Sequence, residues 1–486
     1  MKFRLTKGNF LKTGAYMEGD SAIFTFAAEK EDECSIVLLD KSGNTACVID
    51  IPAEYSTGSL YSVRLHGFCG NEYAYYFRIN GKRCIDPYAT RIFGREKWND
   101  KTRSDNDYEI ACGIDSSDFD WKYDSFPEIT RDRMKLYKLH VRGFSMDVSG
   151  DKKHKGTFEA VSDRINYIKK LGFTSILLMP VYEFEEMTIP VKHDIPEYAK
   201  PKYSLKDEQS VHTENDKVNF WGYTSGNYFA VKASYASDAS DASNELRRLV
   251  ERLHKNGMEC IVEMYFPDRT DHNLILDALR YWVMSFHVDG FKLLGDRLPV
   301  TAIVQDALLS RTKILYDGFD MSVVPQNRTY ENLYIDKEEY QFAARMMLNH
   351  INCNMYELLN QQKKQGENVG FINYISSNNG FTLSDLFMYN DRHNEANGEK
   401  NADGPSWNFS NNYGCEGPSR KRFIREIRKL KWKDAMLLLF LAQGVPMIMA
   451  GDEICNSQDG NNNAYCQDNP TGWVNWSNEH SRRENI

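Results

Sequence analysis

Acidic and amide side chains stand where several short apolar runs of this sequence end. Carboxyl groups can act as acids, bases or nucleophiles, and amides can bind a ligand by hydrogen bonds, when a fold gathers them at one edge. One run, RYWVMSFHVDGFKLLGDR at 280–297, is typical of an amphipathic helix, an Asp-Gly turn and a buried strand. This strand ends at Leu293, Leu294 and Gly295, without a chemically active side chain. The positions of interest at the ends of these runs are His140, Arg142, Pro180, Glu183, Glu263, Asp268, Asp296, Asp317, Asn378, Asn379, Asp452 and Glu453.

The order of the elements predicts a fold that would gather these positions. Residues 1–125 alternate short β-type runs with Gly, Asn and Asp turns, which predicts an all-β sandwich. After a linker at 126–133, residues 134–486 alternate apolar strands with helices, as in a (β/α)8 barrel. We therefore expect the strand-end positions to share the mouth of the barrel. Seven strands are evident at 134–141, 175–181, 259–266, 289–294, 313–318, 370–379 and 445–453, and an eighth is expected near ENLYIDKE at 331–338.

The bulk composition excludes several classes of protein. The chain has 486 residues, 41% of them hydrophobic, and a net charge of −9, which describes a soluble multidomain protein without a nucleic-acid or anionic-membrane surface. The N-terminus lacks the apolar segment of a signal peptide, so we expect a cytoplasmic protein. The ten cysteines have no zinc spacing, and no P-loop, dinucleotide or G-x-S-x-G pattern occurs. We therefore expect neither a metal nor a cofactor.

Three segments give further expectations about helices. FEAVSDRINYIKKLG at 158–172 predicts one helix between two barrel strands. The apolar run at 435–450 is shorter than the roughly 20 residues that a membrane span needs, so it predicts a buried helix that leads into a buried strand. The basic stretch at 419–434 predicts a solvated helix face, because the protein as a whole is acidic.

Six long segments carry a more specific signal. They are YKLHVRGFS (137–145), GTFEAVSDRINYIKKLGFTSILLMPVYEF (156–184), NFWGYTSGNYFAVKASYAS (219–237), HVDGFKL (287–293), YNDRHNEANGEKNADGPSWN (389–408) and QGVPMIMAGDEICNSQDGNNNAYCQDN (443–469). In this order they resemble the isoamylase and glycogen-debranching branch of the α-amylase superfamily. The resemblance implies a glycogen-binding-type module before the barrel and an ancestral substrate, an α-glucan with α-1,6 branches.

The resemblance also implies where the catalytic groups should stand. Retaining glycosidases use two carboxyl groups roughly 5 Å apart, one as nucleophile and one as acid/base, and this family adds a third carboxylate. The nucleophile ends a D-G-F-R-F-D run, and here Leu294 replaces it while Lys292 replaces the arginine that orients it. Asp317 stands in place of the acid/base glutamate and is one methylene shorter. Asn378 and Asn379 replace a His-Asp pair, and an amide supplies no negative charge to the transition state.

A fourth family element also departs from its pattern. The D-x-x-x-N-H sequence after the third strand is represented by residues 263–268, which keep neither the asparagine nor the histidine. We therefore expect a catalytically silent member of the family that binds α-glucan. The expected sugar-binding side chains are Tyr223, Trp221, Asn378, Asn379 and Lys292, although core packing would account equally well for the two aromatic residues.

Two other functions stay open at this point. One is a non-catalytic subunit that associates with an active glucan-metabolising paralogue. The other is an active hydrolase or transferase whose acidic groups, such as Asp317, have been rearranged. Neither nucleic acid nor a membrane is an expected partner.

Several matching positions are expected to be structural. His140 and Arg142 should anchor the end of the first strand, and Asp452 and Glu453 should hold a loop. Residues 461–465, with three consecutive asparagines and Tyr465, would suit either sugar hydroxyls or a turn. The sequence stops at Ile486, where the family continues into a last barrel helix and a C-terminal β domain. We expect both to be missing from it, either because the polypeptide is a fragment or because this lineage has lost them.

Overall fold

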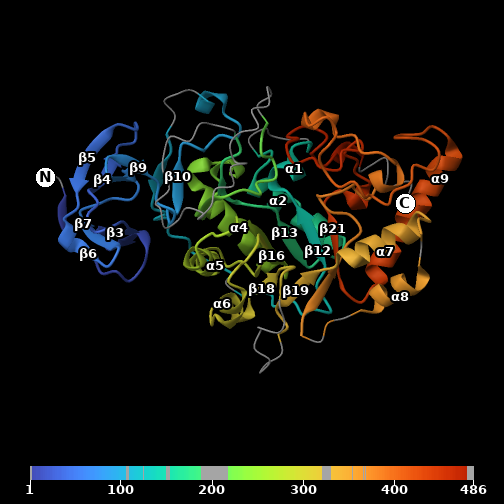
Figure 1. The fold of residues 1–486 in the computed structure, drawn as a ribbon, viewed down its shortest axis with the longest axis horizontal. Coiled ribbons are helices and arrows are strands. Elements are labelled where there is room, and N and C mark those ends of the chain that lie inside the picture. The colour runs from blue at the N-terminus through green and yellow to red at the C-terminus, as the bar shows by residue number, and fades with distance from the viewer. Residues whose placement is uncertain are drawn as a thin grey trace.

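The computed structural model of the chain describes residues 3–104, 109–123, 125–148, 154–187, 217–319, 330–352, 354–364, 366 and 368–478. Two β-sheets formed by the N-terminal residues come first, and a closed parallel barrel follows them (Figure 1). The predicted order of a β-sandwich and a (β/α)8 barrel is therefore confirmed.

The N-terminal region is a sandwich of two antiparallel sheets around one apolar core. Phe26 stacks on Phe77 of the opposite sheet with ring centroids 4.2 Å apart, and Phe24 meets Tyr75 edge-on at 5.0 Å. Such pairs between the inner faces are how a sandwich buries its alternate side chains. One sheet contains β1 (Arg4–Lys7), β2 (Gly14–Glu18), β3 (Ser21–Ala27), β6 (Ser56–Thr57) and β7 (Leu60–His66), and the other contains β4 (Cys34–Leu39), β5 (Thr45–Asp50), β8 (Ala74–Ile79), β9 (Lys82–Cys84), β10 (Arg91–Phe93) and β11 (Ala111–Gly113).

The barrel is made of eight parallel strands in chain order, and the last strand pairs with the first. Part of the barrel interior is filled by a layer of buried apolar side chains, which includes Leu177, Ile261, Leu315 and Ile372. The expected eighth strand near 331–338 is present as β19. The strands are β12 (Leu136–Leu139), β13 (Ser175–Leu178), β16 (Glu259–Tyr265), β17 (Gly290–Leu294), β18 (Lys313–Leu315), β19 (Leu333–Asp336), β20 (Gly370–Asn373) and β21 (Val445–Met449), and a hairpin of β14 (Tyr182–Phe184) and β15 (Gly226–Val231) follows β13.

Helices cover the outside of the barrel (Figure 1). The helix expected at 158–172 is two helices, because Arg164 leaves the helical conformation at φ −98° and ψ 0°. The helices are α1 (Val141–Ser145), α2 (Phe158–Asp163), α3 (Ile165–Lys170), α4 (Ala242–Lys255), α5 (His272–Phe286), α6 (Val300–Gln305), α7 (Glu338–Leu348), α8 (Met355–Lys363) and α9 (Arg422–Leu441).

The run at 435–450 forms the end of α9 and the buried strand β21. The strand was predicted correctly, but the prediction of a buried helix is wrong. Ala435 and Leu439 are buried, whereas Leu437 and Leu441 are 59% and 76% exposed. The apolar side chains of this segment point to two sides of the helix, and only one side packs on the barrel. No helix in the described part of the chain is long and apolar enough to cross a membrane.

The sandwich is joined to the barrel by polar contacts between side chains. Arg247 on α4 donates to Asp115 at 2.8 Å, and the indole of Trp98 donates to Asp468 at 2.8 Å. The last sandwich strand, β11, ends at Gly113 and β12 begins at Leu136, so the expected linker at 126–133 lies between them.

Candidate functional site at the barrel mouth

The positions that the family uses for catalysis all lie at the C-terminal ends of barrel strands. Leu294 is the last residue of β17 and is half-buried. Asp317 lies at the equivalent position of the next strand, because Lys292 pairs with Leu315 in the sheet and each position is two residues further along. Asn378 and Asn379 follow the end of β20. The fold therefore brings the expected positions to one mouth, and Leu294 occupies the end of the fourth strand.

A buried lysine, Lys138, lies at the centre of the mouth. It stands on β12, and its Nζ lies 2.7 Å from Oε1 of Glu263 on β16. The same Nζ donates to Oδ1 of Asn378 at 2.8 Å and to the hydroxyl of Tyr223 at 3.3 Å. Tyr223 in turn donates to Oε2 of Glu263 at 2.6 Å. Two of the side chains expected to bind sugar, Tyr223 and Asn378, thus already bind a lysine of the protein.

A second buried lysine, Lys292, also lies at the mouth. Lys292 on β17 pairs with Asp336, the last residue of β19. Burial alone would lower the pKa of Lys292, but Asp336 and Glu263 outweigh this effect and raise it. Burial lowers the pKa of Lys138, with Glu263 opposing the change and Lys292 adding to it. Both lysines therefore depend on the carboxylates Glu263 and Asp336 to stay charged.

Asp317 is the one carboxyl group that stands at a family catalytic position. Its Oδ1 accepts a hydrogen bond from the backbone N–H of Asp336 at 3.3 Å. Partial removal from water and repulsion from Asp336 raise the pKa of Asp317 to about 6, and Lys292 opposes both. Such a group could donate a proton near neutral pH. At the end of β17, however, Leu294 supplies no oxygen that could attack an anomeric carbon.

The two remaining sugar-binding candidates have different surroundings. Asn379 is exposed at the rim of the mouth. Trp221 is buried beside Tyr223 and Tyr465, with ring centroids 6.1 and 6.4 Å away, and it lines a cavity of about 50 Å³. This cavity is too small for a sugar ring. The geometry thus leaves Asn379 free to meet a ligand, whereas Trp221 packs as a core residue.

The end of the first strand is anchored as the sequence predicted. His140 accepts from the N–H of Gly143 through Nδ1 at 3.0 Å, and its Nε2 lies 3.0 Å from the Tyr235 hydroxyl. Burial lowers the pKa of His140 to about 4, so the ring is neutral at pH 7 and its Nε2–H donates to Tyr235. Arg142 donates from Nε to both carboxylate oxygens of Asp468, at 2.9 and 3.0 Å. These residues hold the loop and are not placed for acid/base chemistry.

The paired carboxylates after β21 also hold a loop. Oδ1 of Asp452 accepts from the N–H of Leu383 at 3.0 Å, and its Oδ2 accepts from the N–H of Met449 at 3.0 Å. Asp452 therefore ties the loop after β20 to the end of β21, which confirms its predicted structural role.

The carboxyl group of Glu453 is surrounded by hydrogen-bond donors. Its Oε1 accepts from the hydroxyls of Tyr137 and Tyr167 at 2.7 and 3.0 Å, and its Oε2 accepts from the N–H of Gly451 at 2.9 Å. Burial nevertheless raises the pKa of Glu453 from 4.5 to about 7, and Asp452 adds to the increase. The carboxyl group therefore keeps its proton in the folded protein at pH values where the unfolded chain has released it.

This shift predicts a specific pH dependence of stability. Between pH 4.5 and about 7 the folded state binds a proton at Glu453 that the unfolded state does not, so the free energy of unfolding falls as the pH rises. Glu453→Gln removes this contribution, so its stability should fall less over that window, by on the order of 2–3 kcal/mol. Urea denaturation at several pH values measures how steeply the free energy of unfolding changes with pH, in the wild type and in the variant. Identical slopes would show that Glu453 does not carry the effect.

Glu416→Gln provides the matched control. Hydrogen bonds from Asn412 and from the backbone outweigh burial there and lower the pKa of Glu416. Its contribution to stability is lost only below pH 4.5, so this variant should keep the wild-type slope between pH 4.5 and 7.

The asparagines at 461–463 form a network between two loops. Asn461 Nδ2 donates to Asn397 Oδ1 at 3.0 Å, Asn462 Nδ2 donates to Asn408 Oδ1 at 3.0 Å, and Asn463 Nδ2 donates to Asp403 Oδ2 at 2.9 Å. Their amides are therefore used within the protein, and they join the loops that follow β20 and β21. The structural alternative for this segment is confirmed.

Sequence reasoning missed two residues of the mouth, Lys138 and Asp336. A signal for Lys138 was present, because a lone lysine inside an apolar strand of a barrel needs a buried carboxylate partner. Asp336 ends a strand that was only weakly marked, so its position at the mouth was not evident. Within the described residues, no group of three or more His, Cys, Asp or Glu side chains is arranged to hold a metal ion.

Several known proteins resemble this chain in sequence. Residues 148–272 match the family model for the catalytic domain of α-amylase. Chloroplastic isoamylase 1 of Arabidopsis thaliana is 27% identical over 86% of this chain, and a glycogen debranching enzyme of Enterobacter sp. (strain 638) is 27% identical over 98% of it. The chain is similar to isoamylases and glycogen-debranching enzymes over most of its length. The sequence resemblance to this branch of the α-amylase superfamily is thereby confirmed.

Solved structures of debranching-type enzymes share the fold. The catalytic module of the glycogen-degrading pneumococcal virulence factor SpuA matches 99% of this chain with a TM-score of 0.68 at 19% identity, and this chain covers 79% of it. Pullulanase from Paenibacillus barengoltzii matches 98% with a TM-score of 0.69 at 16% identity, and 78% of it is covered. The chain spans 63% of the length of the plant isoamylase and 83% of the length of the bacterial debranching enzyme.

Proposed function

We propose that this chain binds α-glucan and does not cleave it. The observation that carries the proposal is Leu294 at the end of β17, where a retaining glycosidase of this fold needs a carboxylate. The match to the catalytic-domain family model ends at residue 272, before β17, β18 and β20. The strand ends at which Leu294, Asp317 and Asn379 lie are therefore outside the matched residues.

The ion pairs of the mouth support the same proposal. An oxocarbenium-like transition state is stabilised by unpaired negative charge close to the sugar ring. Here the buried carboxylates Glu263 and Asp336 are neutralised by Lys138 and Lys292. Carboxylates committed to ammonium groups of the protein offer less charge to a bound sugar.

The class of ligand comes from the relatives and from the surface of the mouth. The relatives carry the names isoamylase and glycogen debranching enzyme, and glycogen is a branched α-glucan. The exposed amide of Asn379 can exchange hydrogen bonds with sugar hydroxyls. We also assign the sandwich, residues 1–125, a role as a carbohydrate-binding-like module that precedes the barrel.

Native gel electrophoresis with and without glycogen tests this function. The protein should migrate more slowly as glycogen is added to the gel, because a bound polymer retards it. Maltohexaose in the running buffer should restore the mobility by competition. Mobility that does not respond to glycogen would contradict glucan binding.

Asp317 favours a second candidate, an active enzyme with rearranged groups. Its pKa of about 6 suits a general acid, and it lies beside Asp336 at the mouth. This candidate requires turnover of branched glucan that is lost in Asp317→Asn.

The outer side of α9 favours a third role, a non-catalytic subunit of an active glucan-metabolising paralogue. Phe423, Leu430 and Leu437 recur every seven residues on this helix and are all exposed. This spacing forms one apolar stripe. A purified active paralogue should then bind the wild-type chain, and the Leu430→Lys variant should no longer bind the paralogue. Equal elution of both proteins as separate species would contradict this role.

A further inference from the structure

The connection that follows β20, residues 374–421, presents a tryptophan to solvent. Trp407 is 39% exposed, and the other seven tryptophans of the sequence are all less exposed than this. A connection after a barrel strand lies on the C-terminal face, where the mouth opens. Trp407 therefore stands on the face that the proposed function uses.

The indole N–H groups of other tryptophans have partners within the fold. Trp432 donates to the carbonyl of Asp452 at 2.9 Å, and Trp473 donates to Asp468 at 2.9 Å. Trp476 donates to the carbonyl of Phe144 at 2.6 Å. The indole N–H of Trp407 donates to no group in the described part of the chain, so it can serve a ligand.

The segment that carries Trp407 is held firmly. The next residue, Asn408, is buried, and its Oδ1 accepts from Asn462 Nδ2 at 3.0 Å. Its carbonyl accepts from the buried guanidinium of Arg345 at 3.3 Å. Asn462 Nδ2 also donates to the carbonyl of Pro405 at 2.9 Å. A ring fixed in this way loses little conformational entropy when a ligand covers it.

The same contacts bring Trp407 close to the rim of the mouth. The carbonyl of Asn462 accepts from the N–H of Gly380 at 2.9 Å, so Asn462 binds the neighbour of Asn379 as well as the neighbour of Trp407. Arg345 lies against Gly380 and also binds the carbonyl of Asn408. Asn379 and Trp407 are therefore carried by two loop segments that meet at Asn462 and Arg345.

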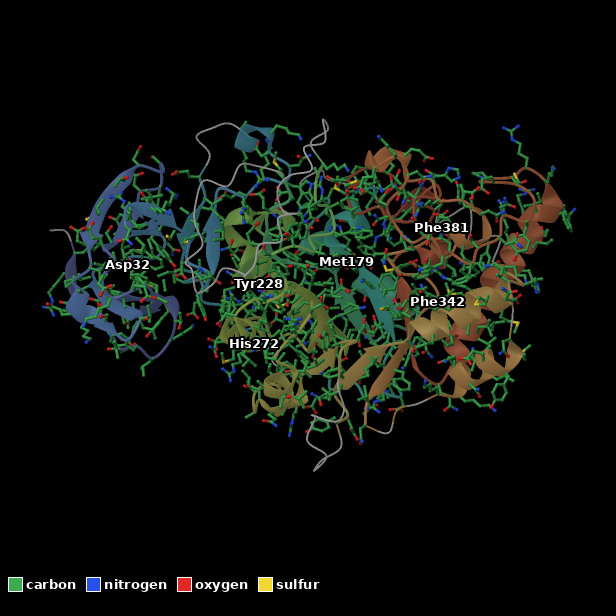
Figure 2. The ribbon with its side chains drawn as sticks, in the orientation of Figure 1. Asp32, Met179, Tyr228, His272, Phe342 and Phe381 are labelled. Atoms are coloured by element: carbon green, nitrogen blue, oxygen red, sulfur yellow. The ribbon has the colours of Figure 1, made fainter. Side chains whose placement is uncertain are left out.

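The rings of two phenylalanines pack against the indole of Trp407. Phe342 on α7 meets Trp407 edge-on with ring centroids 4.5 Å apart, and Phe409 lies 6.3 Å from it. Figure 2 labels Phe342 on α7, beside the loops that carry Phe381. An indole that packs against two other rings and is 39% exposed offers apolar ring surface to a ligand, with a polar N–H at its edge.

We propose that Trp407 is a stacking platform for a glucosyl ring of an α-glucan at the rim of the barrel, beside the amide of Asn379. The apolar face of a pyranose ring would cover the indole, while the indole N–H and the Asn379 amide would bind its hydroxyls. This inference rests on the proposed glucan binding and names the subsite that provides it. Because the platform lies outside the ion pairs of the mouth, it binds sugar without rearranging them.

Isothermal titration with maltohexaose tests the platform on the full chain. Trp407→Ala should weaken binding by about 10- to 100-fold, as for an aromatic residue that dominates a binding surface. Trp407→Phe should retain most of the affinity, because a ring remains. The matched control is Tyr356→Ala on α8, where the aromatic side chain is 74% exposed. This control should bind as the wild type does.

Three outcomes separate the possible failures. If the wild type binds and only Trp407→Ala is weakened while its thermal midpoint is unchanged, the platform is supported. If the wild type and Trp407→Ala bind equally, the platform is wrong and the proposed function stands. If the wild type binds no maltohexaose and is not retarded by glycogen, both are overturned.

Discussion

Replacing Lys138 by methionine lowers the free energy of unfolding by about 3–5 kcal/mol, which is among the largest effects that we expect from a single substitution. The Glu263 side chain is fully buried, and the Lys138 ammonium lies 2.7 Å from it. Without the lysine, Glu263 keeps one hydrogen bond, from Tyr223, and loses its paired counter-ion in a buried site, because the remaining ammonium group nearby, Lys292, is paired with Asp336. Urea denaturation of Lys138→Met and the wild type measures the difference.

A double-mutant cycle shows whether the loss comes from the pair. Lys138→Met with Glu263→Gln removes both charges, so the double variant should be more stable than the sum of the two single effects predicts, by about 2 kcal/mol or more. The control is Arg248→Met, because Arg248 pairs with Asp241 at 3.0 Å on the surface with both side chains more than a third exposed. That variant should lose less than about 1 kcal/mol. Additive effects in the cycle would mean that Lys138 and Glu263 do not stabilise each other.

Turnover of branched glucan should be on the order of 10⁴ to 10⁶ below that of an active debranching enzyme. The reason is the hydrocarbon side chain of Leu294, because loss of a nucleophile removes the covalent step of a retaining mechanism. Reducing ends released from amylopectin by purified protein, with the Enterobacter debranching enzyme as positive control, measure this rate.

Asp317→Asn is the matched variant for this assay. If the mouth is catalytically silent, the residual rate should be the same in the variant and the wild type, since neither has a nucleophile. Robust turnover that disappears in Asp317→Asn would instead support the rearranged enzyme, with Asp317 as its acid.

Much of the fold was predictable, because the alternation of apolar strands and helices is local. All eight barrel strands, including β19, lie within the expected segments. Positions at strand ends, such as Leu294 and Asp317, followed from the strand assignments alone. The exposure of Leu437 and Leu441 on the outward side of α9 was not predictable. A run of apolar residues does not show which side of a helix meets the barrel.

The polar network of the mouth was less predictable. Lys138, Glu263 and Asn378 come from the first, third and seventh strands, and a contact between distant strands depends on barrel closure and on side-chain direction. The rim platform was missed for a related reason. Trp407 lies in the segment 389–408, which carries part of the family resemblance, and its exposure depends on how Asn408 and Asn462 hold two loops together.

The measurement that tests the central claim most directly is the intact mass of the protein after incubation with a fluorinated α-glucosyl fluoride, a reagent that glycosylates the nucleophile of retaining glucosidases. An active debranching enzyme treated in parallel should gain the mass of one glycosyl group. For this chain we predict an unchanged mass, because Leu294 offers no oxygen to the anomeric carbon. A glycosyl adduct on Asp317, Asp336, Glu263 or any other carboxylate would contradict the account.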